Sequence, residues 1–331
     1  MGLTAADSPA APPAELVERF RDDLRAIWPE AGQAGGLGIA LSGGPDSTAL
    51  LLLAAAALPG QVAAATVDHR LRPQSAREAS EAGALCARLG VPHRVLAVEV
   101  AAGNIQAEAR KARYAALAGW IAGEGLAALA TAHHADDQAE TLLARLNRAS
   151  GVKGLAGTRA RGVVPGTGIA LLRPLLGWRR GELGAIVTRC GVVPADDPSN
   201  SDERFDRVRI RKAIADADWL DVPAIAQSAR HLADADAALE WAAAREWSEC
   251  VRRGGFGLTY RPRAPRAIAL MVLARIVAEL DGSEPRGAAV ARLFDTLATN
   301  SPASIGGLVA RPGPEGWNFA RAPVRKAPKL S

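Results

Sequence analysis

The segment Leu37-Gly-Ile-Ala-Leu-Ser-Gly-Gly-Pro-Asp-Ser47 joins a short apolar run to a turn rich in glycine and serine. The run predicts a buried strand, and the apolar residues of 48–58 predict a buried helix directly after the turn. This is the usual setting of a phosphate-binding loop, because backbone N–H groups at a helix start can face an anion. The candidate ligand-binding residues of the turn are Ser42, Gly43, Gly44, Pro45, Asp46 and Ser47.

Asp46 and the absence of a lysine distinguish this turn from the commonest phosphate-binding loops. The Walker pattern GxxxxGK[ST] uses its lysine to hold the phosphates that such enzymes transfer. An acidic residue is compatible with an anion site if it caps the helix or helps to hold Mg²⁺ against the phosphates. A lysine-free Ser-Gly-Gly-x-Asp-Ser loop resembles that of the PP-loop ATP pyrophosphatases, which holds the pyrophosphate that leaves while AMP is attached to a substrate. The simpler alternative is a glycine-rich turn whose serine only caps the helix.

Strand and helix patterns alternate from residue 37 to residue 190. We expect strands at 37–41, 61–67, 93–100, 126–132 and 168–172, and helices at 48–58, 76–89, 105–121, 136–148 and 180–190. This alternation predicts an α/β fold with helices on both faces of a parallel sheet. In such sheets ligands bind beyond the carboxyl ends of the strands, which is where the turn 42–47 would lie.

The patterns change on either side of this region. Residues 1–30 predict a loose extension followed by one amphipathic helix. Past about residue 215 the strand signals fade, and three helices and one hairpin are expected at 222–249, 268–280, 288–297 and 305–321. We therefore predict three parts: the N-terminal extension and helix over 1–30, a PP-loop, adenine nucleotide alpha-hydrolase-like domain over 31–215, and a smaller, mainly α-helical domain over 216–331.

The composition of the 331-residue chain excludes several classes of protein. Hydrophobic residues make up 49% and charged residues 23%, which excludes a mostly disordered chain and a coiled coil. Lys and Arg number 40 against 35 Asp and Glu, and this excess fits nucleic-acid or phosphate partners as well as it fits a GC-rich genome. Cys86, Cys190 and Cys250 stand far apart, so a zinc module, an iron–sulfur site and a disulfide scaffold are not expected.

No membrane partner is expected from the sequence. The longest apolar run, 49–58, is shorter than the about 20 residues that span a bilayer. The first residues lack the basic and apolar regions of a secretory signal. We therefore expect a cytoplasmic protein.

Further motifs follow the turn 42–47 in a fixed order. They occupy 67–75, 108–114, 131–141, 145–151, 154–157, 172–176, 196–200 and 207–211. In order and spacing they resemble the tRNA(Ile)-lysidine synthetase family, densely over about 37–215 and loosely beyond. The specific feature is the His-His-x-Asp-Asp-Gln-x-Glu-Thr run of 133–141 together with the PP-loop.

The resemblance implies a reaction in two steps on a tRNA. ATP adenylates the ring carbonyl oxygen of the cytidine at the first anticodon position of the isoleucine tRNA with anticodon CAU. The ε-amino group of free L-lysine then displaces AMP and gives lysidine. A ring carbonyl oxygen leaves poorly until AMP is attached to it, and the attacking amine must lose a proton, so a carboxylate within reach is useful.

The resemblance and the motifs together assign roles to individual residues. The expected catalytic residues are Asp46, Arg113, Asp137 and Arg148. His69 and His133 join the loop residues Ser42 to Ser47 in contacting ATP, and Asp46 holds Mg²⁺. The basic segment of Arg204, Arg207, Arg209, Arg211 and Lys212 is expected to contact the tRNA, together with the domain 216–331.

Each of these side chains also has a plainer interpretation. Acidic residues at helix starts usually cap the helix, so we assign the cap to Asp136 and catalysis to Asp137, which shares a helix face with Glu140. Single arginines on helices usually face solvent. His133 and His134 could serve packing as well as ligand contact.

Two departures from the family pattern stand out. Ala149 and Val208 replace a glycine and an asparagine, so the turn at Ala149 is expected to differ and one polar contact to be missing. The chain also looks like a short form that lacks the additional C-terminal module of many relatives. The alternatives are another PP-loop tRNA enzyme such as a thiolase, a small-molecule PP-loop synthetase, and a non-catalytic RNA-binding protein.

Overall fold

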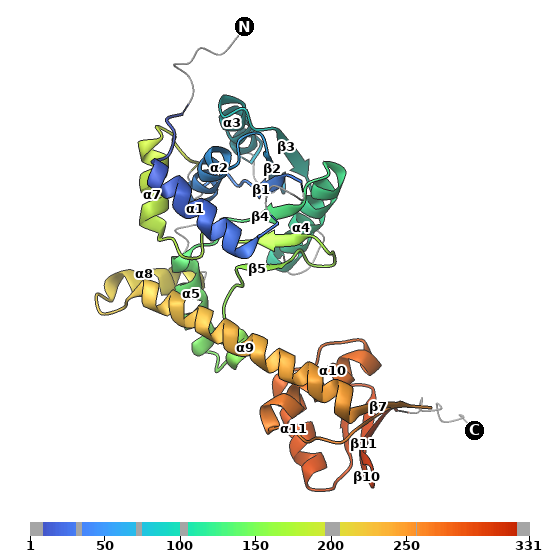
Figure 1. Ribbon diagram of the computed structural model, residues 1–331. Coiled ribbons are helices and arrows are strands. Elements are labelled where there is room, and N and C mark those ends of the chain that lie inside the picture. The colour runs from blue at the N-terminus through green and yellow to red at the C-terminus, as the bar shows by residue number, and fades with distance from the viewer. Residues whose placement is uncertain are drawn as a thin grey trace, which may run out of the picture. The chain divides into compact units, whose positions relative to one another are not determined.

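The computed structural model describes residues 9–30, 35–70, 75–99, 105–195, 206–255 and 257–322. The chain divides into two compact units, Met1–Ala233 and Asp234–Ser331. The division falls inside helix α9 (Val222–Cys250), whereas the sequence placed the start of the C-terminal domain before that helix. Figure 1 shows the N-terminal unit in blue to yellow and the C-terminal unit in orange to red.

The N-terminal unit contains a six-stranded sheet in the order β3-β2-β1-β4-β6-β5. Its strands are β1 (Leu37–Ala40), β2 (Val62–Asp68), β3 (His93–Ala97), β4 (Ala128–Ala130), β5 (Arg161–Val163) and β6 (Ala170–Leu172). All pairs are parallel except β5 with β6, so the predicted parallel sheet is confirmed. The antiparallel edge strand β5 was not expected, because three residues with two exposed positions give no strand pattern.

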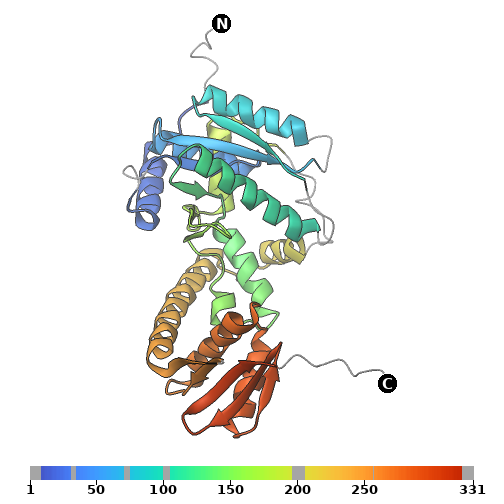
Figure 2. The same ribbon diagram turned by 90° about the vertical axis from the view of Figure 1, so that its right-hand side faces the viewer.

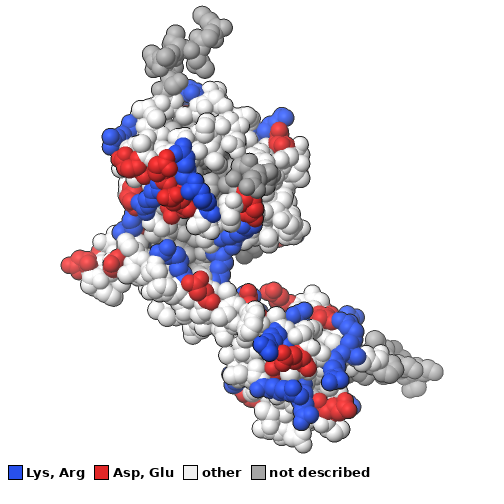
Figure 3. All heavy atoms as spheres, in the orientation of Figure 1, with Lys and Arg blue, Asp and Glu red and all other residues white. Residues whose placement is uncertain are grey.

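The helices of this unit lie on both faces of the sheet, as predicted. They are α1 (Ala14–Ile27), α2 (Pro45–Ala57), α3 (Ser75–Arg88), α4 (Ile105–Gly123), α5 (Ala135–Leu146), α6 (Val152–Leu155), α7 (Arg180–Arg189), α8 (Asp206–Asp216) and the first part of α9. Helices α1, α2, α3 and α7 share one core with the sheet, and α4 packs on the other face through Leu117 and Ile121. On the surface of α1, acidic and basic side chains alternate and pair, among them Arg25 with Asp22 at 3.0 Å (Figure 3).

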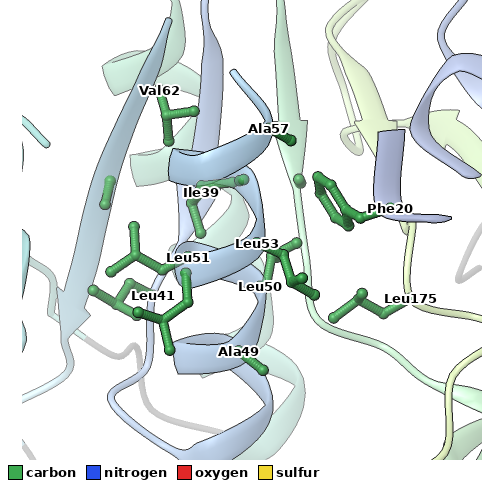
Figure 4. Close-up of a cluster of buried hydrophobic side chains, with 14 of the residues drawn as sticks. Phe20, Ile39, Leu41, Ala49, Leu50, Leu51, Leu53, Ala57, Val62 and Leu175 are labelled. Atoms are coloured by element: carbon green, nitrogen blue, oxygen red, sulfur yellow. The ribbon is translucent and has the colours of Figure 1, made fainter. Parts of the chain in front are cut away.

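Helix α2 is surrounded by protein, which accounts for the apolar residues on all of its sides. Leu51 lies beside Ile39 and Leu41 of the strand β1 region, while Leu50 and Leu53 point toward Phe20 of α1 (Figure 4). Full burial of each such side chain contributes about 1.5–3 kcal/mol. This packing fixes the start of α2, and hence the turn 42–47, against the end of β1.

The C-terminal unit is a five-stranded antiparallel sheet with helices packed on it (Figure 2). The strand order is β7 (Val251–Gly254), β8 (Gly257–Tyr260), β11 (Gly316–Arg321), β10 (Leu308–Gly313) and β9 (Ala303–Ile305). Helices α10 (Arg266–Asp281) and α11 (Gly287–Ala298) confirm two predicted helices, and β10 with β11 forms the predicted hairpin. The other three strands are an addition to the predicted helical domain; each has only three or four residues, too few for a periodic signal.

Candidate active site

The turn 42–47 joins β1 to α2 in a tightly bonded form. Gly43 has φ of +84°, in the left-handed region that favours glycine. The Ser42 and Ser47 hydroxyls lie 3.0 Å apart, and Ser47 Oγ also accepts the Ser42 N–H at 3.1 Å. The first helical hydrogen bond runs from Thr48 N–H to the Gly44 carbonyl, so the N–H groups nearer the helix start face outward for an anion.

A pocket of about 210 Å³ opens beside this turn, at the carboxyl ends of β1 and β2. Backbone and small apolar side chains of both strands form its floor, and Ser42, His69 and Arg113 line it. The structure therefore brings together three of the residues that we predicted for ATP contact and catalysis. An apolar floor with a few polar groups at its edge suits a purine base and its phosphates.

Arg113 brings a positive charge to this pocket, which His69 and Glu78 also line. Burial lowers the pKa of Arg113, and no carboxylate pairs with its guanidinium among the residues that the structure describes. Burial, and then the charge of Arg113, lowers the pKa of His69 and so favours its neutral form. A half-buried guanidinium without a carboxylate partner favours an anionic ligand.

Strands β1 and β4 are neighbours, and the segments that follow them meet. His134, after β4, is 1% exposed, and its Nε2 lies 3.4 Å from Asp46 Oδ2 and 3.6 Å from Asp137 Oδ2. Its Nδ1 lies 3.5 Å from Asp136 Oδ2. Burial opposes protonation of this ring, but the Asp136 and Asp46 carboxylates outweigh burial and raise its pKa to about 9. His134 is therefore a charged bridge between the loop and α5.

Of the two neighbouring carboxylates after β4, Asp137 takes the capping role that we predicted for Asp136. Asp137 Oδ2 accepts the backbone N–H of His134 at 3.1 Å and so caps α5, the task assigned to Asp136. Asp136 instead accepts hydrogen bonds from Arg179 and from the Arg180 backbone N–H at 2.8 Å. Asp136 thus ties the start of α7 to the site, while Asp137 both caps α5 and faces Asp46 through His134.

Arg207 and Arg211 of α8 contact carboxylates of α5. Arg207 reaches Asp137 at 2.9 Å and Glu140 at 3.1 Å, and Arg211 reaches Glu140 at 2.7 Å. The Glu140 side chain is 1% exposed, so these pairs compensate a buried charge. RNA contact by these arginines stays a prediction. Arg209 and Lys212 are exposed on α8, and Arg204 lies outside the described residues.

Known proteins with similar sequences share the PP-loop domain of this chain. The family model of the PP-loop domain matches residues 17–217. The tRNA(Ile)-lysidine synthase of Novosphingobium aromaticivorans is 47% identical over 93% of this chain and 94% of its own length. This chain belongs to the tRNA(Ile)-lysidine synthase family. The enzyme of that name from Zymomonas mobilis is 40% identical over 88% of this chain and 90% of its own length.

Among solved structures, the U34-tRNA thiolase NcsA from Methanococcus maripaludis has the same fold in part. Its TM-score is 0.54 at 15% identity, over 66% of this chain and 78% of the thiolase chain. The likeness concerns the fold alone. The thiolase alternative is not favoured for this member of the lysidine synthase family. Its cysteines are all buried, and the described residues contain no group of three His, Cys, Asp or Glu side chains that could hold a metal.

Arg148 and Ala149 follow α5 at the end opposite to the carboxylates. With a rise of about 1.5 Å per residue, Arg148 stands roughly 16 Å along the axis from Asp137, so the structure does not bring these two residues together. Ala149 has φ of +51°, in the left-handed region that favours glycine. The turn was expected to differ at Ala149; it instead keeps the left-handed conformation, which costs an alanine about 1–2 kcal/mol.

His133 and Arg173 follow the neighbouring strands β4 and β6. His133 Nδ1 lies 3.0 Å from Thr131 Oγ1, and burial lowers the His133 pKa to about 4. Arg173 is 8% exposed, and its Nε is buried without a hydrogen-bond partner among the described residues. The sequence analysis gave no role to Arg173, although it stands in the Leu-Arg-Pro run of 172–174 directly after β6.

No helix among the described residues is long and apolar enough to cross a membrane.

Proposed function

We propose that this ligase attaches AMP from ATP to the cytidine at the first anticodon position of the CAU isoleucine tRNA, and then joins free L-lysine to that cytidine. The products are lysidine in the tRNA, AMP and pyrophosphate. Family membership supports a ligase that forms a carbon–nitrogen bond. The single observation that carries the proposal is the meeting of the lysine-free PP-loop with the carboxylates of α5 through His134.

In the first step the nucleotide occupies the pocket beside the PP-loop. The base lies over the apolar floor at the ends of β1 and β2, next to His69. The backbone N–H groups at the start of α2 and the Ser42 and Ser47 hydroxyls receive the phosphates. The cytidine ring oxygen attacks the α-phosphorus, and the bond to pyrophosphate breaks. Arg113 stabilises the charge that develops on the α-phosphoryl group.

Asp46 fits the role of Mg²⁺ ligand. Its Oδ1 is buried and has no hydrogen-bond partner among the described residues. Mg²⁺ is usually bound by one or two carboxylates together with substrate phosphates, so a full protein cage is not required. When bound, Mg²⁺ neutralises charge on the phosphates that leave.

In the second step lysine replaces AMP. Asp137 holds the ε-amino group, accepts its proton and directs it at the adenylated ring carbon. The ring carbon forms a bond to the lysine nitrogen, and the bond to the AMP oxygen breaks. The basic segment 204–212 and the C-terminal domain hold the tRNA, and the reaction takes place in the cytoplasm, where its substrates are present.

The test is a nucleoside analysis. A CAU isoleucine tRNA transcript is incubated with the protein, ATP, Mg²⁺ and lysine, then digested and examined by mass spectrometry. We expect cytidine at the first anticodon position to gain the mass of lysine minus water, with AMP as the nucleotide product. The matched control is the same transcript with uridine at that position, which should not react. An unmodified CAU transcript, or ADP as the product, would contradict the proposal.

A further inference from the structure

The C-terminal sheet has one face that its own helices do not cover. Its inward side chains, among them Leu258, Tyr260 and Phe319, form the core with α10 and α11. Residues directly paired across neighbouring strands point to the same face, and alternate residues point to opposite faces. Thr259, Asn318 and Arg311 alternate with buried positions of their strands, and Arg252 shares their face because it pairs with Thr259; all four are exposed or half-exposed.

These four residues form a single row across four strands, which we call the arginine row. Arg252 of β7 pairs with Thr259 of β8, Thr259 with Asn318 of β11, and Asn318 with Arg311 of β10. At about 4.8 Å between strands, the two arginines stand roughly 14 Å apart. Thr259 Oγ1 donates to Asn318 Oδ1 at 2.8 Å, which leaves the Asn318 amide N–H groups to donate outward.

Arginines outnumber acidic residues near the row. Arg252 also lines a pocket of about 280 Å³ together with Arg261 and Arg263. Among the described residues none of the arginines Arg252, Arg261, Arg263 and Arg311 forms an ion pair. Two acidic residues line this pocket: Glu249 pairs with Arg245 at 2.8 Å, which leaves the Glu315 carboxylate beside three arginines. The arginines of α1, by contrast, are paired with acids of the same helix.

The remaining positions of this face are small. Gly257, Gly313, Gly316, Ala320 and Ser304 alternate with the buried residues of their strands, so the face is flat around the row. A flat face with arginine forks and amide donors can approach a sugar–phosphate backbone closely. A membrane would require large apolar side chains for insertion, and Val309 is the largest that the described strands present here.

We propose that this open face binds the sugar–phosphate backbone of the tRNA through the arginine row, an inference that rests on the proposed function. Phosphates on the backbone contact Arg252 and Arg311, and the Asn318 amide donates to a phosphate or ribose oxygen between them. Because such contacts carry no sequence information, the row holds the RNA and leaves base recognition to the active-site unit.

The experiment is a tRNA binding titration at several salt concentrations with the full chain. The variant Arg252→Ala/Arg311→Ala removes the ends of the row. The matched control Arg286→Ala/Arg292→Ala removes two exposed arginines at α11, which packs on the opposite side of the sheet. We expect the row variant to bind more weakly, with a log–log salt slope smaller by about 1.4–1.8, since each lost contact removes roughly 0.7–0.9. The control should bind as the wild type does.

A third variant, Arg252→Lys/Arg311→Lys, keeps the charge and should restore most of the slope. Row and control variants with the same affinity and slope would overturn the proposal, as would a lysine variant as weak as the alanine variant. The row variant is also titrated with anionic phospholipid vesicles. If it bound these vesicles more weakly than the wild type but bound tRNA unchanged, the proposal would likewise be overturned. Lysidine formation by the wild type is measured on the same tRNA. Its absence would refute the proposed function, whereas its presence with unchanged binding by the row variant would refute the row alone.

Discussion

His134 Nε2 lies 3.4 Å from Asp46 Oδ2 and so joins the segment after β4 to the phosphate-binding loop after β1. The two strands are adjacent, and the chain runs outward from them in opposite directions to β2 and β6. In parallel α/β sheets this change of direction opens a crevice for ligands. The charged imidazole and the carboxylates around it therefore stand where a nucleotide and a second substrate can meet.

The first prediction separates the three carboxylates around His134. Asp46→Asn and Asp137→Asn should each lower the rate of lysidine formation by at least about a hundredfold, as expected when a catalytic group is removed. Asp136→Asn should cost less activity but lower the melting temperature, because Asp136 anchors Arg179 and the start of α7. Rate assays and thermal melting on the three variants check this. Equal, small rate losses would leave Asp46 and Asp137 with structural roles only.

The second prediction concerns Arg211 and Arg209, which stand two residues apart on α8. Arg211→Ala removes one of two arginine partners of the buried Glu140 and should lower the free energy of unfolding by about 1.5–3 kcal/mol, since Arg207 still pairs with Glu140. Arg209→Ala changes an exposed position, so it should change the free energy of unfolding by no more than about 0.5 kcal/mol but reduce the salt slope of tRNA binding by roughly 0.7–0.9. Urea unfolding and salt-dependent tRNA binding of both variants test this prediction. Reversed effects would mean that Arg211, rather than Arg209, holds the RNA.

The third prediction is a dependence of stability on pH. Burial holds the pKa of His133 at about 4, below its ordinary value of about 6.5. Protonation therefore favours the unfolded chain: the contribution is complete above pH 6.5 and is lost as the pH falls toward 4, by up to about 3 kcal/mol. His133→Asn retains reach to Thr131 but cannot take up the proton. Urea unfolding at pH 7.5 and pH 4.5 should show a smaller acid loss in the variant, and equal losses would contradict the account.

The fourth prediction uses the strained turn after α5. Ala149→Gly should raise the free energy of unfolding by up to about 1 kcal/mol, because glycine adopts the left-handed conformation without strain. The control Ala144→Gly lies inside α5 and should lower it by about 0.5–1 kcal/mol. Chemical denaturation of both variants is the measurement. Destabilisation by Ala149→Gly would show that the turn relaxes in solution.

The sequence predicted those features of the site that depend on residues adjacent in the chain. The loop 42–47 could be placed because a buried strand, two glycines and an apolar helix adjoin it in the chain. The ion pair of Arg211 with Glu140 joins residues 71 positions apart, and no spacing rule shows which face of α8 meets α5. The cap of α5 was assigned to the wrong carboxylate for a related reason. Both Asp136 and Asp137 suit a helix start, and contact with Arg179 of a distant segment decides between them.

The short strands of the C-terminal sheet could not be predicted from the sequence either. β7 reads Val-Arg-Arg-Gly and β9 has three residues, so neither shows the alternation that predicts a strand. They form because β8 and β10 offer them open edges, and that information is tertiary. Ala149 shows the converse, since the turn that closes through the hydrogen bond from the Ser150 N–H to the Arg145 carbonyl gives it a conformation that its own preference opposes.

The central claim, that the PP-loop transfers AMP to an anticodon cytidine, is tested most directly by isotope exchange. Labelled pyrophosphate is incubated with the protein, ATP and Mg²⁺, with and without the CAU isoleucine tRNA, and lysine is left out. The account predicts that label enters ATP only when the tRNA is present and has cytidine at the first anticodon position. Exchange without the tRNA, or exchange that requires lysine, would contradict it.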